Sequence, residues 1–297
     1  MRLAQYYSSD DPSNGKIRLV AIRDGQPVEL AQVDPRLPRT LRQWLIAGQD
    51  VLAATRQACA VAPVVDVSTW RLLPPIHDPE KIFCVGLNYA DHARETNAAI
   101  PTEPCIFNKF PTTLRAHGDP IVLPTIARQV DFEAELVVVI GREGRNIARD
   151  HAFDYVAGYA CGHDVSARDW QKTKPGGQWL LGKSFDSFGP LGPHFVSADE
   201  VPDPHDLKIE MRLNDQLMQS SNTREMIFRI DVLIEYLSAV ATLKPGDLIF
   251  TGTPAGVGVA RKPQVFLQPG DVADVSIEGI GLLKNPVVAQ EFGPNGE

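Results

Sequence analysis

The chain has 297 residues, of which 43% are hydrophobic and 22% charged, a composition typical of a globular protein with a sizeable core. Its 37 acidic and 29 basic residues give a formal net charge of −8, and no Lys- or Arg-rich run is present, which argues against a nucleic-acid partner. No apolar run reaches the roughly 18 residues of a membrane span, and no apolar stretch typical of a secretory signal opens the chain, so we expect no membrane partner.

The four cysteines form no C-x-x-C pair, and each lies among apolar neighbours. This pattern is typical of buried free thiols in a reducing compartment, so we expect a cytoplasmic protein without disulfides. The residues concerned are Cys59, Cys84, Cys105 and Cys161.

The first 72 residues are predicted to form a small α+β domain. Alternating runs at Lys16–Ile22 and Pro27–Val33 flank Asp24-Gly25, which is a hairpin signal. Apolar residues at near-helical spacing between Leu41 and Ala58 predict one or two helices, and the Pro-containing stretch 71–79 is typical of a linker.

Residues 73–297 are predicted to form a larger, β-rich domain. Short β-branched runs alternate with Gly- and Pro-rich turns, and 231–241 has the apolar spacing of a helix. Many short strands with few helices favour a sheet curled on itself over a doubly wound sheet. The expected strands are Ile82–Val85, Leu136–Ile140, Val156–Gly162, Leu207–Leu213, Asp247–Thr251 and Val272–Ile277.

Two glutamates open the most apolar of these strands. Glu133 and Glu135 are two residues apart, so in a strand their side chains share one face. Two neighbouring carboxylates in a buried strand repel each other and lose hydration, which favours a bound cation. The alternative is a solvated edge strand with an acidic face.

Asp164 adds a third carboxylate at the end of another apolar strand. Three oxygen ligands suit Mg²⁺ best, Mn²⁺ similarly and Ca²⁺ less well. Zinc is disfavoured because no His or Cys cluster accompanies the carboxylates. The alternative for Asp164 is a helix cap, because 166–171 has the composition of a helix start.

His92 and Glu95 are three residues apart and share a face if their segment is helical. A carboxylate beside an imidazole fixes its tautomer and raises its basicity, which is what a general base requires. The alternative is an ordinary surface pair.

The stretch Gly177–Ser184 fits the phosphate-loop pattern G-x-x-x-x-G-K-[ST]. Its context does not fit, because a polar segment precedes it and Gly189-Pro190 would interrupt a following helix, so we do not expect nucleotide binding or kinase activity. The loop Thr251–Gly258 is instead predicted to be a tight turn whose backbone N–H groups can face an anion.

Taken together, the motifs resemble those of the fumarylacetoacetate hydrolase superfamily over roughly residues 77–290. The family order G-x-N-Y-x-x-H-x-x-E, E-x-E, D-x-x-A-R-D, a lysine, then G-D-x-I-x-T-G-T-P-x-G-V-G is present in this chain. The resemblance implies a β-rich mixed-sheet roll of the α+β class, usually a homodimer, with Mg²⁺ or a related ion. It implies metal ligation by Glu133, Glu135 and Asp164, catalysis by His92, Glu95 and Lys183, and substrate binding by Tyr89, Arg168, Gln171 and Thr253.

The resemblance also implies a small 2-oxo or dioxo acid substrate and a metal-stabilised enolate. Many acylpyruvate-cleaving members have arginine where this chain has Leu87, and a member with an apolar residue there is associated with oxaloacetate keto–enol tautomerisation, which we therefore expect. The alternatives are acylpyruvate C–C hydrolysis, oxaloacetate decarboxylation and hydroxymuconate-type isomerisation. A different class of alternative is a non-catalytic, metal-stabilised binding protein.

Overall fold

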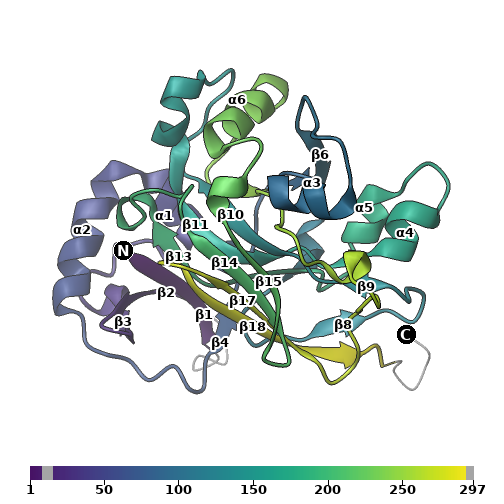
Figure 1. The fold of residues 1–297 in the computed structure, drawn as a ribbon. Coiled ribbons are helices and arrows are strands. Elements are labelled where there is room, and N and C mark those ends of the chain that lie inside the picture. Colours follow the sequence, from purple (N-terminus) through teal and green to yellow (C-terminus); the bar gives the residue numbers. More distant parts are fainter. Residues whose placement is uncertain (9–15, 292–297) are drawn as a thin grey trace.

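The computed structural model describes residues 1–8 and 16–291, which form two mixed β-sheets with short helices around them (Figure 1). The helices α1 and α2 lie beside the N-terminal strands, and α4 and α5 lie at the opposite end of the molecule (Figure 1). The predicted α+β class is confirmed. Within the described residues, no helix combines the length and the apolar character needed to cross a membrane.

The larger sheet has eleven strands, nine of them in the order β3-β2-β1-β13-β11-β10-β16-β5-β6. β4 pairs with β1 and β7 pairs with β13, and only the pairs β16–β5 and β13–β7 are parallel. The strands are β1 (Arg2–Ser8), β2 (Lys16–Arg23), β3 (Gln26–Glu29), β4 (Arg71–Leu73), β5 (Ile82–Gly86), β6 (Cys105–Asn108), β7 (Leu114–Arg115), β10 (Ala134–Ile140), β11 (Val156–His163), β13 (Gly189–Ser197) and β16 (Leu248–Phe250).

The smaller sheet has five strands in the order β15-β14-β17-β18-β8. A separate two-stranded ladder joins β9 (Val130–Asp131) to β12 (Ser166–Ala167). The five strands are β8 (Ile121–Leu123), β14 (Lys208–Leu213), β15 (Gln216–Asn222), β17 (Val272–Ile277) and β18 (Gly281–Ala289).

Short helices connect and cover the sheets. The longest apolar stripe belongs to α6, which buries side chains at positions 230, 233, 234 and 237, the spacing of one helical face. The α-helices are α1 (Leu41–Ala47), α2 (Gln49–Val61), α3 (Ala90–Thr96), α4 (Arg168–Thr173), α5 (Trp179–Lys183) and α6 (Ile230–Val240). The 3₁₀ helices are Leu30–Gln32, Pro111–Thr113, Arg149–Tyr155, Ala198–Glu200, Thr223–Glu225 and Gly258–Ala260.

Strand β10 lies in the interior, with all seven residues buried. Its alternating side chains belong to two hydrophobic cores: Leu136 and Val138 to one, and Val137 and Val139 to the other. Since Glu135 has the same parity as Val137, the pleat directs its side chain to the face of Val137. The prediction that Glu133 also lies in this strand is wrong, because β10 begins at Ala134. The alternative of a solvated edge strand is therefore wrong.

Several predicted elements are confirmed and some need correction. The hairpin is confirmed, but its second strand ends at Glu29, and the two helices replace the single helix alternative. The linker prediction for 71–79 is wrong at Arg71–Leu73, because β1 pairs with this segment and makes it a strand. The predicted boundary at residue 72 stays a prediction.

The cysteines are free as expected, but not all are buried. Cys84 and Cys161 are buried, Cys59 is partly buried and Cys105 is exposed. Cys105 lies on β6, the last strand of the large sheet. Whether a residue on an edge strand is buried depends on the segments that pack over the edge, so the prediction of burial is wrong for Cys105.

Candidate active site

Three carboxylates converge at the start of β10. Glu133, Glu135 and Asp164 are buried, and each offers an oxygen within 4.8 Å of the others. The pairing of β10 with β11 brings them together, because Ala134 lies opposite His163 and Asp164 N–H donates to the Glu133 carbonyl at 2.9 Å. The predicted clustering of these three side chains is confirmed.

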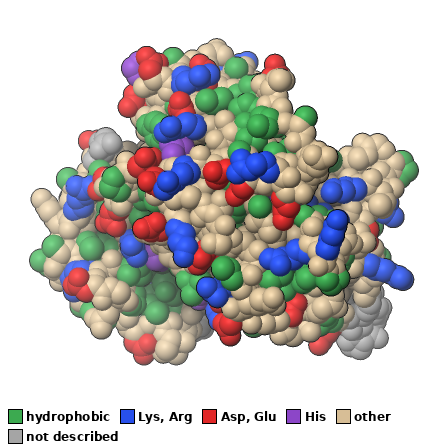
Figure 2. All heavy atoms as spheres, in the orientation of Figure 1, with side chains coloured by type: hydrophobic (Ala, Val, Ile, Leu, Met, Phe, Trp, Pro, Cys, Tyr) green, Lys and Arg blue, Asp and Glu red, His purple; other side chains and the backbone are tan. Residues whose placement is uncertain are grey.

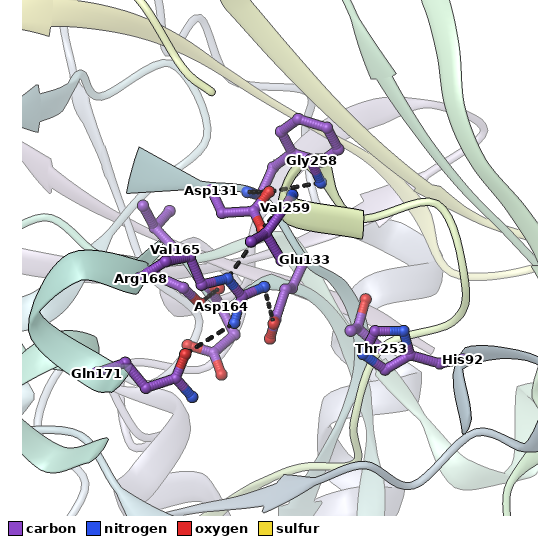
Figure 3. Close-up of polar contacts among 12 residues, drawn as sticks. His92, Asp131, Glu133, Asp164, Val165, Arg168, Gln171, Thr253, Gly258 and Val259 are labelled. Atoms are coloured by element: carbon purple, nitrogen blue, oxygen red, sulfur yellow. Dashed lines mark hydrogen bonds and ion pairs between the residues drawn. The ribbon is translucent and has the colours of Figure 1, made fainter. Parts of the chain in front are cut away.

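Lys183 and Arg168 neutralise part of this acidic cluster. Lys183 Nζ donates to Glu133 Oε2 and to Asp164 Oδ2, both at 2.8 Å. Arg168 Nη2 donates to Glu133 Oε1 at 2.5 Å, and its Nε donates to Asp131 Oδ2 at 2.8 Å (Figure 3). All five side chains are buried, so these pairs lie in a low-dielectric interior where charge interactions are strong.

The carboxylates differ in how readily they ionise. Burial opposes ionisation of Glu133, but the charges and hydrogen bonds of Lys183 and Arg168 lower its pKa well below the ordinary value. Burial and the neighbouring charges of Asp164 and Glu133 raise the pKa of Glu135 well above the ordinary value. Glu135 is held by a backbone N–H group and not by a side-chain cation, so a positive charge beside it would favour its ionised form.

The donor set fits a hard divalent cation. Asp164 Oδ1 is buried and lies 2.6 Å from Lys109 Nζ, and its second lone pair remains available inside the cluster. Glu135 Oε2 accepts one hydrogen bond, from Gly252 N–H at 2.8 Å. Carboxylate oxygens without nearby thiolates are the ligands that Mg²⁺ and Mn²⁺ prefer.

Helix α3 carries the predicted His–Glu pair. His92 Nδ1 lies 3.2 Å from Glu95 Oε2, and both side chains are partly buried. Glu95 also accepts from Gly256 N–H at 2.9 and 3.1 Å, so the pair is anchored to another segment. Burial opposes ionisation of Glu95, yet these hydrogen bonds from His92 and Gly256 lower its pKa. The predicted pairing on a helix is confirmed.

The remaining predicted residues surround the carboxylates. Gln171 Oε1 accepts from Arg168 Nη1 at 3.0 Å, and Thr253 Oγ1 donates to the Ala134 carbonyl at 2.9 Å. Figure 3 shows Arg168 and Gln171 on one side of Glu133, and Thr253 and His92 on the other. Tyr89 is fully buried, and its hydroxyl has no hydrogen-bond partner among the described residues. The roles assigned to these side chains stay predictions.

The loop between β16 and residue 259 donates backbone N–H groups to three carboxylates. Gly252 N–H faces Glu135, Gly256 N–H faces Glu95, and Gly258 N–H donates to Asp131 Oδ1 at 2.7 Å. Glycine is required at the first two positions, where φ is +98° and +104° and an added Cβ would lie 2.7 Å and 2.2 Å from other atoms. The N–H groups that were predicted to face an anion bind the protein's own carboxylates.

Asp131, Lys109 and Gln219 were not identified from the sequence. Asp131 holds Arg168 and the loop, and its spacing of two from Glu133 was an available signal. Lys109 lies 2.6 Å from Asp164 Oδ1, and Gln219 Nε2 donates to Thr253 Oγ1 at 2.8 Å. These two residues come from distant segments with no distinctive local pattern.

Two cavities differ in their relation to this cluster. A cavity of about 880 Å³ lies beside α1 and α2, and none of the site residues lines it. A cavity of about 550 Å³ is lined by Glu95, Gly256, Arg261 and Lys262. The second cavity therefore reaches the His–Glu pair, through Glu95.

Comparison with known proteins agrees with this geometry. Residues 81–288 match the family model described as fumarylacetoacetate (FAA) hydrolase C-terminal. The chain is 48% identical over 289 residues to a Xenopus laevis protein named oxaloacetate tautomerase fahd2, mitochondrial, covering 97% of this chain and 90% of the relative.

Solved structures match over the whole fold. Fumarylacetoacetate hydrolase from Exiguobacterium antarcticum has a TM-score of 0.83 and 36% identity, covering 98% of this chain and all of that one. Maleylpyruvate hydrolase from Sphingobium sp. SYK-6, in complex with manganese(II) and pyruvate, has a TM-score of 0.80 and 30% identity, with coverage of 98% and 100%. The predicted mixed-sheet roll is confirmed.

The prediction of a cytoplasmic location is wrong in the light of these relatives. The Xenopus laevis protein, like its Bos taurus and Homo sapiens counterparts, is named as mitochondrial. Free cysteines indicate a reducing environment, and this observation does not distinguish between compartments that share that property.

Proposed function

We propose, for a chain that belongs to the fumarylacetoacetate hydrolase family, the activity of a divalent-metal-dependent enzyme that interconverts the keto and enol forms of oxaloacetate. The observation that carries this proposal is the buried cluster of Glu133, Glu135 and Asp164 with Lys183 beside it. The name of the 48% identical Xenopus laevis relative supports the choice of substrate and reaction.

We propose Mg²⁺ as the resident ion, held by Glu133, Glu135 and Asp164. When bound, it supplies a Lewis acid that polarises the keto and carboxylate oxygens of a 2-oxo acid. The manganese and pyruvate in the structure of the maleylpyruvate hydrolase support a hard divalent cation and an oxo acid at such a site. Mn²⁺ is the alternative ion.

The cations of the site have distinct tasks in this proposal. Burial opposes the charge of Lys183, but Asp164 and Glu133 outweigh burial and raise its pKa, so its ammonium keeps its protons. The ammonium stabilises negative charge that develops on the keto oxygen as the neighbouring carbon loses a proton. Arg168 holds Glu133 and orients Gln171. We propose that Gln171, Thr253 and Tyr89 contact the substrate.

In this proposal His92 transfers the proton. Glu95 holds Nδ1 of His92, which leaves Nε2 to take a proton from the carbon next to the keto group and return it to oxygen. No water is consumed, which distinguishes this reaction from C–C hydrolysis. Leu87 supports the choice, because no guanidinium stands at the position where many acylpyruvate-cleaving relatives have one.

We also propose that residues 1–72 form a small N-terminal domain and that the protein is a homodimer, as the family resemblance implies. Sedimentation velocity tests the dimer, since a species near the monomer mass of 32.6 kDa at micromolar concentration would contradict it.

The decisive experiment is a panel assay with Mg²⁺ and a binding measurement. We expect ultraviolet absorbance to report accelerated enol–keto exchange of oxaloacetate, and we expect Glu135→Gln to abolish both turnover and Mn²⁺ binding by calorimetry. The matched control is Glu29→Gln, a buried carboxylate held by Gln32 and Arg18 away from the site.

Faster hydrolysis of acetylpyruvate or fumarylpyruvate, decarboxylation of oxaloacetate, or hydroxymuconate-type isomerisation would replace the proposed reaction by that one. Mn²⁺ binding without turnover of any of these acids would favour the non-catalytic binding protein. Full activity of Glu135→Gln would refute the metal site itself.

A further inference from the structure

Lys109 follows β6 directly, and its side chain is completely buried. Its ammonium donates to the backbone carbonyls of Val165 at 3.2 Å and Phe188 at 2.8 Å, and to that of Lys183. A lysine ammonium carries three protons, and these three carbonyls together with the Asp164 carboxylate satisfy them inside the protein.

The three carbonyls belong to segments that carry the site. Val165 follows Asp164 in the chain, Lys183 ends α5, and Phe188 immediately precedes β13. One buried ammonium therefore ties the backbone of a proposed metal ligand to the backbone of the proposed substrate lysine, although 19 residues separate Asp164 from Lys183.

The same ammonium lies 2.6 Å from Asp164 Oδ1, which is the distance of a close ion pair between two buried groups. The attraction holds Asp164 in place. A carboxylate oxygen has two lone pairs, so Oδ1 can still offer one of them to a cation.

Phe107, on β6, also supports Lys183. It lies two residues before Lys109, and Lys183 Nζ lies 5.0 Å from the centre of its ring. The segment 107–109 thus contacts both ends of Lys183: Phe107 faces the ammonium, and Lys109 binds the carbonyl.

The simpler interpretation is that the Lys109–Asp164 ion pair only stabilises the fold. The Lys81–Asp247 ion pair serves as a comparison. Lys81 Nζ lies 2.8 Å from Asp247 Oδ2, and Asp247 is fully buried. Lys81, however, is about a quarter exposed, and its ion pairs are with Asp247 and Glu80, whereas Lys109 contacts Asp164 and Lys183.

We infer that Lys109 is a positioning residue that fixes Asp164 and Lys183 relative to each other in the reactive geometry. The inference rests on the proposed function for its catalytic consequence, but its effect on metal binding is independent of the substrate. Groups that orient metal ligands without touching the ion typically contribute about 10- to 100-fold to metal affinity or activity.

The test is calorimetric titration of the full chain with Mn²⁺ in the absence of substrate, for Lys109→Met, Lys109→Arg and the control Lys81→Met. We expect Lys109→Met to weaken Mn²⁺ binding by about 10- to 100-fold and to lower kcat similarly. Lys81→Met should lower the melting temperature and leave the Mn²⁺ affinity unchanged, because its pair lies outside the cluster.

Lys109→Arg provides the second variant, in case the uncharged side chain prevents folding. A planar guanidinium keeps the charge but cannot aim three protons from one point, so we expect intermediate weakening of Mn²⁺ binding. Wild-type Mn²⁺ affinity in either Lys109 variant would overturn the inference, and so would tighter binding, which would mean that Lys109 acts only by repelling the cation.

The outcomes separate the two proposals. A wild-type chain that binds Mn²⁺ but does not tautomerise oxaloacetate would refute the proposed reaction, and the Lys109 variants would still decide the positioning role. A wild-type chain that does not bind Mn²⁺ would overturn both.

Discussion

At the scale of single residues, similar local patterns have different surroundings. His92–Glu95 and His151–Asp154 are both i,i+3 pairs with a ring nitrogen 3.2 Å from a carboxylate oxygen. The first pair is mostly buried and bound to Gly256, whereas both side chains of the second are about two-thirds exposed. An exposed pair is worth little in water, so only the first pair has a fixed imidazole.

We therefore expect His92→Gln to lower kcat by on the order of 10²-fold or more, because the proton acceptor is lost. His151→Gln is the matched control and should leave kcat unchanged. Steady-state kinetics with Mg²⁺ and oxaloacetate measures both, and equal rates for His92→Gln and wild type would remove His92 from the mechanism.

The clustering of Glu133, Glu135 and Asp164 could be predicted because it depended on spacing within one apolar run and on the ends of two strands that pair. These are local patterns of residues 130–164, and metal ligation by the three side chains stays a prediction. Lys109 could not be found in this way, because its partners are backbone carbonyls, which have no sequence signature. Its contacts depend on how β6 packs beside α5, and no local pattern specifies that packing.

At the scale of elements, the loop after β16 determines where α3 sits. Gly256 N–H binds Glu95 on α3, and the φ of Gly256 is +104°. A side chain there would be strained by its backbone conformation and would also collide with the Met218 carbonyl, 2.2 Å from an ideal Cβ.

We expect Gly256→Ala to lower kcat by more than tenfold and to destabilise the fold, since relieving the collision moves the N–H away from Glu95. Gly270→Ala is the control: its φ is +96°, but an added Cβ meets nothing within 4 Å. It should cost about 1 kcal/mol of unfolding free energy and leave kcat unchanged. If both variants lose the same amount of stability and keep full activity, the loop does not position the His92–Glu95 pair.

Among the elements, strands with a clear apolar pattern were predictable, and the marginal ones were not. β17 coincides with its predicted range, and its core residues Ala273, Val275 and Ile277 alternate along the strand. β4 has only three residues and pairs with β1, so its strand character comes from the partner. Such pairing energy is tertiary and does not appear in the local sequence.

At the scale of the whole molecule, the N-terminal strand is part of the large sheet. β1 pairs with β13, and His194 on β13 lies near Arg2 and the turn at Gly281. On the face shown in Figure 2, acidic and basic side chains are interspersed. The lack of a nucleic-acid partner stays a prediction.

His194 makes the stability of this junction depend on pH. Burial and the charge of Arg2 lower the pKa of His194 from 6.5 to about 4. Above pH 6.5 the imidazole is neutral in both the folded and the unfolded state, so it makes no pH-dependent contribution. As the pH falls below 6.5, the unfolded state takes up the proton first, and the free energy of unfolding decreases until about pH 4.

We expect the wild type to lose roughly 2–3 kcal/mol more unfolding free energy than His194→Gln between pH 7 and pH 4. Urea unfolding at several pH values measures the difference, and the other titrating groups cancel because both proteins share them. Parallel pH profiles would show that His194 is as well solvated in the folded chain as in the unfolded one.

The loop that holds Asp131, Glu95 and Glu135 through its own N–H groups has a thermodynamic consequence. One short segment is shared by the carboxylate cluster and by the helix that carries His92. We therefore expect binding of the proposed cation at one end to affect binding of the proposed oxo acid at the other. Such a linkage is reciprocal: whatever the cation adds to the affinity for the oxo acid, the oxo acid adds to the affinity for the cation.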